Sequence, residues 1–516
     1  MVVFEWVLAL LLGSVMLGFL ARRIGAPYPS LLAIAGTGLA LLPFAPRLSL
    51  PPDLALALFV APVLLDAAFD APVRDIRRYA GVIASLVLVA VGLTTAVVAV
   101  VARSLEPAMP WAAAMALGAI VAPPDAAAAL AVLKQLRPPH RVLVILEGES
   151  LLNDATALLI YRLAVGAVAA GGLSAVQVAP TLLLVVIGSI GVGAFLGWAF
   201  TTATRRIEDV PSAIILQFVG TFGVWLLADG LHLSGVLTIV AFAVVASRLT
   251  ALIPARMRVA SFAVWETGVY VLNVIAFVLM GLQIRPILQV LDPSRRTEYF
   301  VFALAVLAAA VLTRMVWVMI VTAAWRWEYR RFGARRPRPW PAPSLRRGLV
   351  VGWCGMRGLV TLAAAYGLPH GFPFRDLILL TAFAVVLGTL TVQGLTLRPL
   401  VRLLGLRPDH EIDREIRFTR EAMARAALDA LEGVGGPFAE ALRLEHQARL
   451  DATRSAPNGF TGGSTEQDVL RRTVVEAQRR TLAELRRRGE IADDAFHRVE
   501  EELDWAELSA LRTDVS

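Results

Sequence analysis

The sequence predicts an all-α polytopic membrane protein. Hydrophobic residues make up 57% of the 516 positions and charged residues only 17%, and the mean hydropathy is +0.67. A soluble protein needs more charge than this to cover its surface. Apolar runs of about 17–25 residues also recur between Val2 and Leu404, and each is long enough to cross a hydrocarbon layer of about 30 Å.

About thirteen membrane-spanning helices are expected, arranged as six, one linking helix and six. The expected spans lie near 3–20, 29–45, 54–70, 80–102, 111–133, 144–169, 177–203, 211–228, 233–250, 264–290, 300–325, 347–368 and 376–404. Lys and Arg concentrate in the connections after the odd-numbered spans, and such residues favour the cytoplasmic side. The N-terminus is therefore expected outside and the C-terminus in the cytoplasm. The basic residues are expected to contact membrane lipid and not nucleic acid.

Two spans carry helix-breaking residues at corresponding places. The fifth contains Pro123 and Pro124, which remove two backbone donors, and the twelfth contains Gly355 and Gly358. Two inverted six-helix repeats with broken helices 5 and 12 are therefore expected. Unwound backbone inside a membrane is tolerated where protein buries it or where it lines a cavity, so the paired breaks predict an ion site.

The chain after the last span changes character. Charged amphipathic stretches follow, which predicts a helical cytoplasmic tail over 406–516 behind a transmembrane domain over 1–405. The single cysteine, Cys354, excludes a disulfide framework. We expect no cofactor and, in the absence of a nucleophile–base set or phosphate loop within the spans, no enzymatic activity.

The densest group of polar residues opens the sixth span, within 147–154. Glu149 and Asn153 are four residues apart, as are Ser150 and Asp154, so each pair shares a helix face. The side chains offer oxygen ligands, which suit a hard cation such as sodium. We expect Asp154 and Ser150 to bind the ion, because an ionisable group within a span is by default a functional candidate.

Three further charged residues lie within spans. Asp125 follows the proline pair, and it either contributes to the ion site or caps a half-helix. Asp66 in the third span is a second candidate, or a residue at the membrane interface. Arg357 needs a buried carboxylate partner, for which Glu149 is the expected choice, and such a structural ion pair leaves Asp154 free to titrate.

Four stretches together resemble the monovalent cation:proton antiporter family of the NhaP type, the electroneutral sodium/proton exchanger branch. The resemblance covers roughly residues 5–405 and rests on 62–68, 122–126, 147–155 and 352–358. It implies a homodimer, in which each protomer has a dimerisation domain and a mobile six-helix core with two crossing unwound helices. It also implies that the transmembrane domain is an antiporter domain in the inner membrane and that the tail is regulatory.

The resemblance also assigns roles to residues. Asp154 matches the family's ion- and proton-binding aspartate, Ser150 a side-chain ligand, and Asp125 the aspartate of the unwound fifth helix. Asn153 stands where electrogenic relatives have a second aspartate, which implies one-for-one exchange. The chain departs from the family at Pro124, which offers no hydroxyl, and at Asp66, where many relatives have Glu. Glu149 and Arg357 match its buried ion pair.

These observations predict a secondary transporter that exchanges sodium for protons by alternating access, with one carboxylate binding either ion. Potassium/proton exchange is the nearest alternative. A cation channel and a non-transporting membrane sensor remain alternatives from other classes.

Overall fold

The computed structural model describes residues 2–43, 51–136, 138–170, 175–207, 209–249, 255–332, 344–406, 411–455, 466–488, 490, 499–500 and 502–505. Helices joined by turns make up these residues, and no β-strand occurs among them. The chain divides into two compact units, Met1–Arg407 and Pro408–Ser516. The predicted all-α class is confirmed for the described part of the chain.

Eight described helical segments are long and apolar enough to cross a membrane. They are Ala80–Leu105, Trp111–Leu136, His140–Val168, Leu183–Thr204, Val210–Gly230, Met257–Val290, Pro293–Arg331 and Arg375–Leu404. Three shorter apolar helices cover Tyr28–Ala40, Leu56–Phe69 and Gly235–Leu249. Large apolar side chains such as Leu184 and Leu304 are also exposed on the first unit, as contact with lipid requires. The polytopic prediction is therefore confirmed, whereas thirteen spans and an inverted repeat stay predictions.

The helices of the first half lie between Val2 and Ala170. Their bounds are α1 (Val2–Ile24), α2 (Tyr28–Ala40), α3 (Pro52–Ala55), η1 (Leu56–Val60), α4 (Ala61–Phe69), α5 (Val73–Arg78), α6 (Ala80–Ala84), η2 (Ser85–Ala90), α7 (Val91–Leu105), α8 (Trp111–Val121), α9 (Ala126–Leu136) and α10 (His140–Ala170). The segments η1 and η2 are single π-helical turns within longer helices.

The second half continues with the helices that reach the end of the first unit. They are α11 (Ala175–Thr204), α12 (Val210–Gly230), α13 (Gly235–Leu249), α14 (Ala255–Leu282), α15 (Ile284–Val290), the 3₁₀ turn η4 (Pro293–Arg295), α16 (Arg296–Phe332), α17 (Leu345–Trp353), α18 (Leu359–Tyr366) and α19 (Arg375–Leu404). Local chemistry sets several ends. The Asp209 carboxylate accepts the Ser212 N–H at the start of α12, and Gly405 ends α19 in the left-handed region.

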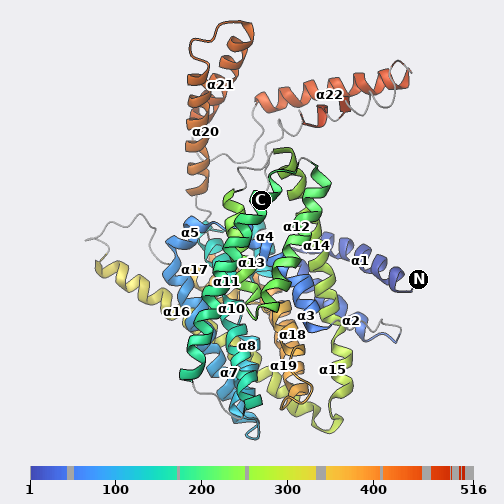
Figure 1. The fold of residues 1–516 in the computed structure, drawn as a ribbon, viewed down its shortest axis with the longest axis vertical. Coiled ribbons are helices and arrows are strands. Elements are labelled where there is room, and N and C mark those ends of the chain that lie inside the picture. The colour runs from blue at the N-terminus through green and yellow to red at the C-terminus, as the bar shows by residue number, and fades with distance from the viewer. Residues whose placement is uncertain are drawn as a thin grey trace. The chain divides into compact units, whose positions relative to one another are not determined.

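The tail unit contains α20 (Glu411–Ala430), α21 (Pro437–Ser455) and α22 (Glu466–Arg487). Helices α20 and α21 pack against each other as a hairpin, which Figure 1 shows in orange. An ion pair between Arg454 and Glu421, 3.1 Å apart, links the two helices.

The helices of the first unit form two packed groups. The core bundle comprises α7–α10 and α16–α19, in which α8 packs against α7 and α10, and α16 against α7, α17 and α19. The flanking bundle comprises α2, α4 and α11–α14, in which α13 packs against α4, α11 and α12, and α14 against α2. Helix α2 also contacts α19, so it joins the two groups.

Glycines allow α2 and α14 to approach at backbone distance. A Cβ on Gly36 would lie 2.5 Å from the Val278 carbonyl oxygen, and a Cβ on Gly281 would lie 2.5 Å from that of Ala33. Small residues at helix contacts permit such close packing in membranes. The position of α2 beside the core bundle therefore depends on these two glycines.

We predict that Gly36→Ala destabilises the protein by roughly 1–3 kcal/mol, because the added methyl group must push against backbone. Gly38, two residues on, has open space at its Cβ position and is the matched control. Gly38→Ala should leave stability unchanged or slightly raised. Thermal unfolding of both variants in one detergent measures the difference, and equal unfolding temperatures would contradict the proposed contact.

Candidate ion-binding site

The two predicted helix breaks are present, and they meet. Residues 122–125 separate α8 from α9, and 354–358 separate α17 from α18. The Asp125 N–H donates to the Met356 carbonyl oxygen at 2.6 Å, so the unwound segments bond directly to each other. Pro123 and Pro124 cannot continue the first helix, and the glycines at 355 and 358 relax the second. The sequence breaks thus create four half-helix ends at one place.

Asp125 lies at the N-terminal ends of two of these half-helices. Its Oδ1 accepts the Ala127 N–H at 2.8 Å, which caps α9 as the sequence alternative allowed. Its other carboxylate oxygen lies against Gly358, the residue before α18, where a Cβ would overlap the carboxylate. Helix N-termini carry partial positive charge, so this position favours an anionic side chain.

Arg357 serves the opposite ends. Its side chain is fully buried and donates from Nε to the Val121 carbonyl at the end of α8, at 3.0 Å, and from Nη1 to the Gly355 carbonyl after α17. Nη2 donates to the Ala310 carbonyl of α16 at 3.3 Å. The last carbonyls of a helix lack intrahelical partners and carry partial negative charge. Carbonyl oxygens therefore stabilise this guanidinium without a carboxylate contact.

The predicted Glu149–Arg357 ion pair is wrong. Glu149 instead forms a two-bond ion pair with Arg314 of α16: Nη1 donates to Oε1, and Nη2 donates to Oε2 at 2.9 Å. Both side chains are at most 3% exposed. Arg314 Nη2 also reaches the Val351 carbonyl of α17 at 3.1 Å. The Glu149 carboxylate forms two parallel hydrogen bonds with the guanidinium of Arg314. The guanidinium of Arg357 instead donates to carbonyl oxygens near helix ends.

Arg314 was missed by the sequence interpretation. Its signal was available, because a lone arginine within the apolar run 301–325 is as costly as Arg357 in the broken span. Arg357 was predicted as the partner of Glu149 because it lies within the glycine-rich break of the twelfth span. Nothing in the sequence states which of the two arginines faces Glu149, since α16 and α17 approach α10 only in the folded bundle.

The polar stripe of α10 lies along the first break. Asn153 is fully buried, and its Nδ2 donates to the Pro124 carbonyl at 2.6 Å. Ser150 Oγ accepts the Ala126 N–H at 3.3 Å. The Asn153 amide oxygen has no hydrogen-bond partner among the described residues. Asn153 and Ser150 therefore fix the unwound backbone against α10 and leave one oxygen available.

Asp154 is the unpaired acid of the cluster. It is partly accessible, and among the described residues no hydrogen bond or ion pair involves its carboxylate. Its electrostatic neighbour is the Asp125 carboxylate. Two carboxylates of like charge in a low-dielectric interior favour the uptake of a proton or a cation between them.

A large cavity borders the Asp154 side of α10. Its volume is about 820 Å³, and its lining includes Ala155 and Thr156, which follow Asp154, and Ala363 of α18. Residues of α11, α12 and α13 line the opposite wall, and Arg162 and Asp229 are among its charged residues. The cavity thus lies between the core and flanking bundles, and its lining includes the residues that follow Asp154 in α10.

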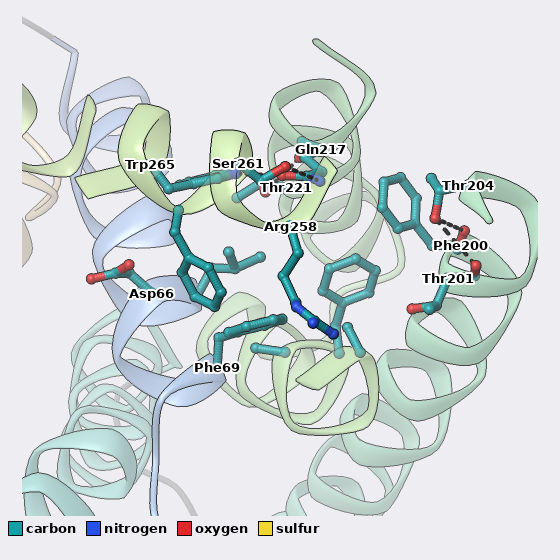
Figure 2. A pocket seen from close by; sticks show the side chains of 15 residues that line it. Asp66, Phe69, Phe200, Thr201, Thr204, Gln217, Thr221, Arg258, Ser261 and Trp265 are labelled. Carbon is teal, nitrogen blue, oxygen red and sulfur yellow. Dashed lines mark hydrogen bonds between the residues drawn. The ribbon is translucent and has the colours of Figure 1, made fainter. Parts of the chain in front are cut away.

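Asp66 does not join the acid cluster. It lines a separate pocket between α4 and helices α11–α14 of the flanking bundle, where Figure 2 shows its carboxylate directed away from the guanidinium of Arg258. Its electrostatic neighbours are Asp70, Lys134 and Glu266. Asp66 thus lies in a different pocket from the cluster around Asp154, because α4 packs mainly on α13, and its role in ion or proton binding stays a prediction.

The described residues contain no group of three or more His, Cys, Asp or Glu that could hold a metal ion as a resident cofactor. What the cluster offers is a set of oxygens from Asp154, Asp125, Ser150 and Asn153. Oxygen ligands of this kind suit a hard cation.

Comparisons with known proteins decide the family. The profile described as "Sodium/hydrogen exchanger, transmembrane" matches residues 7–403. The chain belongs to the sodium/hydrogen exchanger family. The exchangers are secondary transporters and not enzymes, so the predicted antiporter class and NhaP-type resemblance are confirmed.

Relatives and solved structures agree with this assignment. An uncharacterized Na(+)/H(+) exchanger of Mycobacterium tuberculosis is 30% identical over 527 residues, which cover 98% of this chain and 96% of that protein. A "Sodium, potassium, lithium and rubidium/H(+) antiporter" of Bacillus pumilus is 27% identical and covers 93% of this chain and 74% of its own length. The sodium proton antiporter MjNhaP1 of Methanocaldococcus jannaschii at pH 8 shares the fold, with a TM-score of 0.59 at 18% identity over 78% of this chain and 98% of its own.

We predict that Arg314→Met destabilises the exchanger by about 3–5 kcal/mol, because it leaves the buried Glu149 charge without its partner. The double variant Glu149→Met with Arg314→Met removes both charges and should recover much of that loss. The folded fraction and unfolding temperature in detergent measure both effects. Equal losses for the single and double variants would show that Arg314 does not compensate Glu149.

Proposed function

We propose that this exchanger moves sodium ions and protons in opposite directions across the cytoplasmic membrane, with Asp154 binding either ion. The observation that carries the proposal is the position of Asp154. Its carboxylate has no bonding partner among the described residues and neighbours that of Asp125. The next two residues of α10, Ala155 and Thr156, line the large cavity between the two bundles. A structural acid is normally paired when it is buried; an acid that is left unpaired beside a second acid can serve as a binding site.

The cycle follows from electrostatics. An uncompensated carboxylate is costly inside a membrane protein, so the site is stable when a proton or a cation neutralises it. Both bind the same oxygens, and binding of one therefore expels the other. The core bundle exposes the site to one side and then to the other, and its movement requires the neutral form.

Each polar residue of the cluster has a part in this proposal. Asp154 and Asp125 supply charge, and Ser150 and the free Asn153 oxygen supply neutral ligands. Glu149 with Arg314, and Arg357 at the helix ends, hold the frame without taking part in exchange. Asn153 stands where electrogenic relatives have a second aspartate, so the resemblance supports replacement of one proton by one cation and hence electroneutral exchange.

Sodium is the proposed cation, and potassium is the alternative. The relative from Bacillus pumilus is named for sodium, potassium, lithium and rubidium, so members of this family differ in the ions they exchange. Hard oxygen ligands bind all of these ions, and the geometry of the loaded site selects among them. The ion that elicits the fastest proton movement identifies the substrate.

The surroundings of the site complete the proposal. The excess of Lys and Arg after odd-numbered spans supports an N-terminus outside and a cytoplasmic, regulatory tail over 406–516. The protein acts as a homodimer in contact with membrane lipid.

Two other function classes make different predictions. A channel would conduct ions without counter-transport. A sensor would need its tail for output, so removal of the tail separates a sensor from an exchanger that keeps turnover.

We predict that Asp154→Asn abolishes exchange while the protein still folds. The amide neither takes up and releases a proton nor carries the negative charge that attracts a cation. Everted vesicles that carry a pH-sensitive dye report proton movement on addition of sodium, potassium or lithium chloride. Asp209→Asn is the matched control, since Asn also caps α12, and it should transport normally. Full activity of the Asp154 variant would remove this residue from the mechanism.

We predict that Asn153→Asp makes transport sensitive to membrane potential, because an added titratable acid allows more than one proton per cation. In proteoliposomes, an imposed potential should leave the wild-type rate unchanged and alter that of the variant. A strong response of the wild type would overturn one-for-one exchange.

A further inference from the structure

A buried glutamine of the core bundle has no bonding partner. Gln393 of α19 is 1% exposed, and neither its side-chain oxygen nor its nitrogen has a hydrogen-bond partner among the described residues. Buried polar groups in native proteins almost always bond to protein or to ordered water. The side chain therefore requires a partner that offers both a donor and an acceptor.

The register of α19 places Gln393 beside the second break. Thr389, four residues earlier and on the same face, accepts the Arg357 N–H at 3.0 Å. Gly394 faces α2 and the break, since a Cβ there would lie 2.5 Å from Ser30 Oγ and 3.4 Å from Met356 Sδ. Gln393 lies between these two directions. It faces the seam where the unwound segment 354–358 meets the start of α2.

The other wall of this seam is polar as well. The Tyr28 side chain at the start of α2 is hydrogen-bonded to Asn273 of α14 and is an electrostatic neighbour of Asp125. Ser30 Oγ donates to the Leu390 carbonyl of α19 at 2.7 Å. Neither Tyr28 nor Gln393 lines the large cavity beside α10. The seam thus carries polar side chains at a place distinct from that cavity.

We propose that Gln393 binds water in the seam between α2 and the 354–358 break. Water satisfies the amide oxygen and nitrogen together, whereas a metal cation bonds only the oxygen. The water supports the unwound segment whose Met356 carbonyl holds the Asp125 backbone, so Gln393 acts as a positioning residue of the ion site. This second step rests on the proposed exchange at Asp154; the water site itself does not.

Hydroxyl-radical footprinting by X-ray irradiation tests for the water directly. Met356 is fully buried and lies beside Gly394, so its sulfur is oxidised only if water is present next to it. Met280, 3% exposed within α14, is the internal reference. We expect Met356 to oxidise several times faster than Met280 in the wild type and at the reference rate in Gln393→Leu. Equal rates in the wild type, or no effect of the substitution, would overturn the proposal.

Exchange kinetics test the positioning role. Gln393→Leu removes an unpaired buried amide, so a residue without function would give unchanged transport and equal or higher thermal stability. We expect the stability to be maintained and the maximal exchange rate to fall about tenfold, with little change in the half-saturating cation concentration. Loss of a residue that orients ion ligands without touching the ion has an effect of about this size. A rate equal to that of Thr381→Val, a buried and fully bonded control on α19, would overturn the role.

The two measurements separate the two proposals. Loss of exchange in every variant and in the wild type would contradict the exchange function, and the oxidation of Met356 would still report the water. Gln393→Met, which matches glutamine in length, replaces the leucine variant if that one gives too little folded protein.

Discussion

The crossing of two interrupted helices is the constraint on which the rest of this structure depends. Four half-helix ends meet within the membrane-spanning unit, and each would leave backbone groups unsatisfied there. Arg357 bonds the carbonyl ends of α8 and α17, while Asp125 lies at the N-terminal ends of α9 and α18. One cation and one anion thus compensate the two kinds of helix end. The acid site exists because this crossing brings Asp125 to the polar stripe of α10.

The breaks and the polar stripe were predictable because their causes are local. A proline pair cannot continue a helix, and residues four apart share a helix face whatever surrounds them. The partner of Glu149 was not predictable in the same way, since Arg314 and Arg357 are equally plausible until α16 and α17 are placed against α10. The prediction also assumed that a buried guanidinium needs a carboxylate, whereas helix-end carbonyls serve Arg357. The pocket that holds Asp66 was not predictable either, because its position depends on the packing of α4 against α13.

The two bundles differ in what they contribute. The core bundle holds every residue of the acid cluster together with the buried ion pair and the Arg357 contacts. The flanking bundle supplies α2, whose glycine contacts with α14 keep it in place beside α19. Contacts such as the bond from Ser30 to the Leu390 carbonyl join the bundles and must rearrange if one moves against the other. The cavity of about 820 Å³ lies between the two bundles, so movement of one bundle against the other would change its shape.

The central claim is that one carboxylate site holds either a proton or a cation, and proton release on cation binding tests it most directly. Purified protein in weakly buffered detergent solution is mixed with sodium chloride, and a pH indicator measures the protons released, with choline chloride as the reference for ionic strength. The account predicts release of about one proton per protomer at saturating sodium, and none from Asp154→Asn. Sodium binding without proton release, or equal release from the variant, would contradict it.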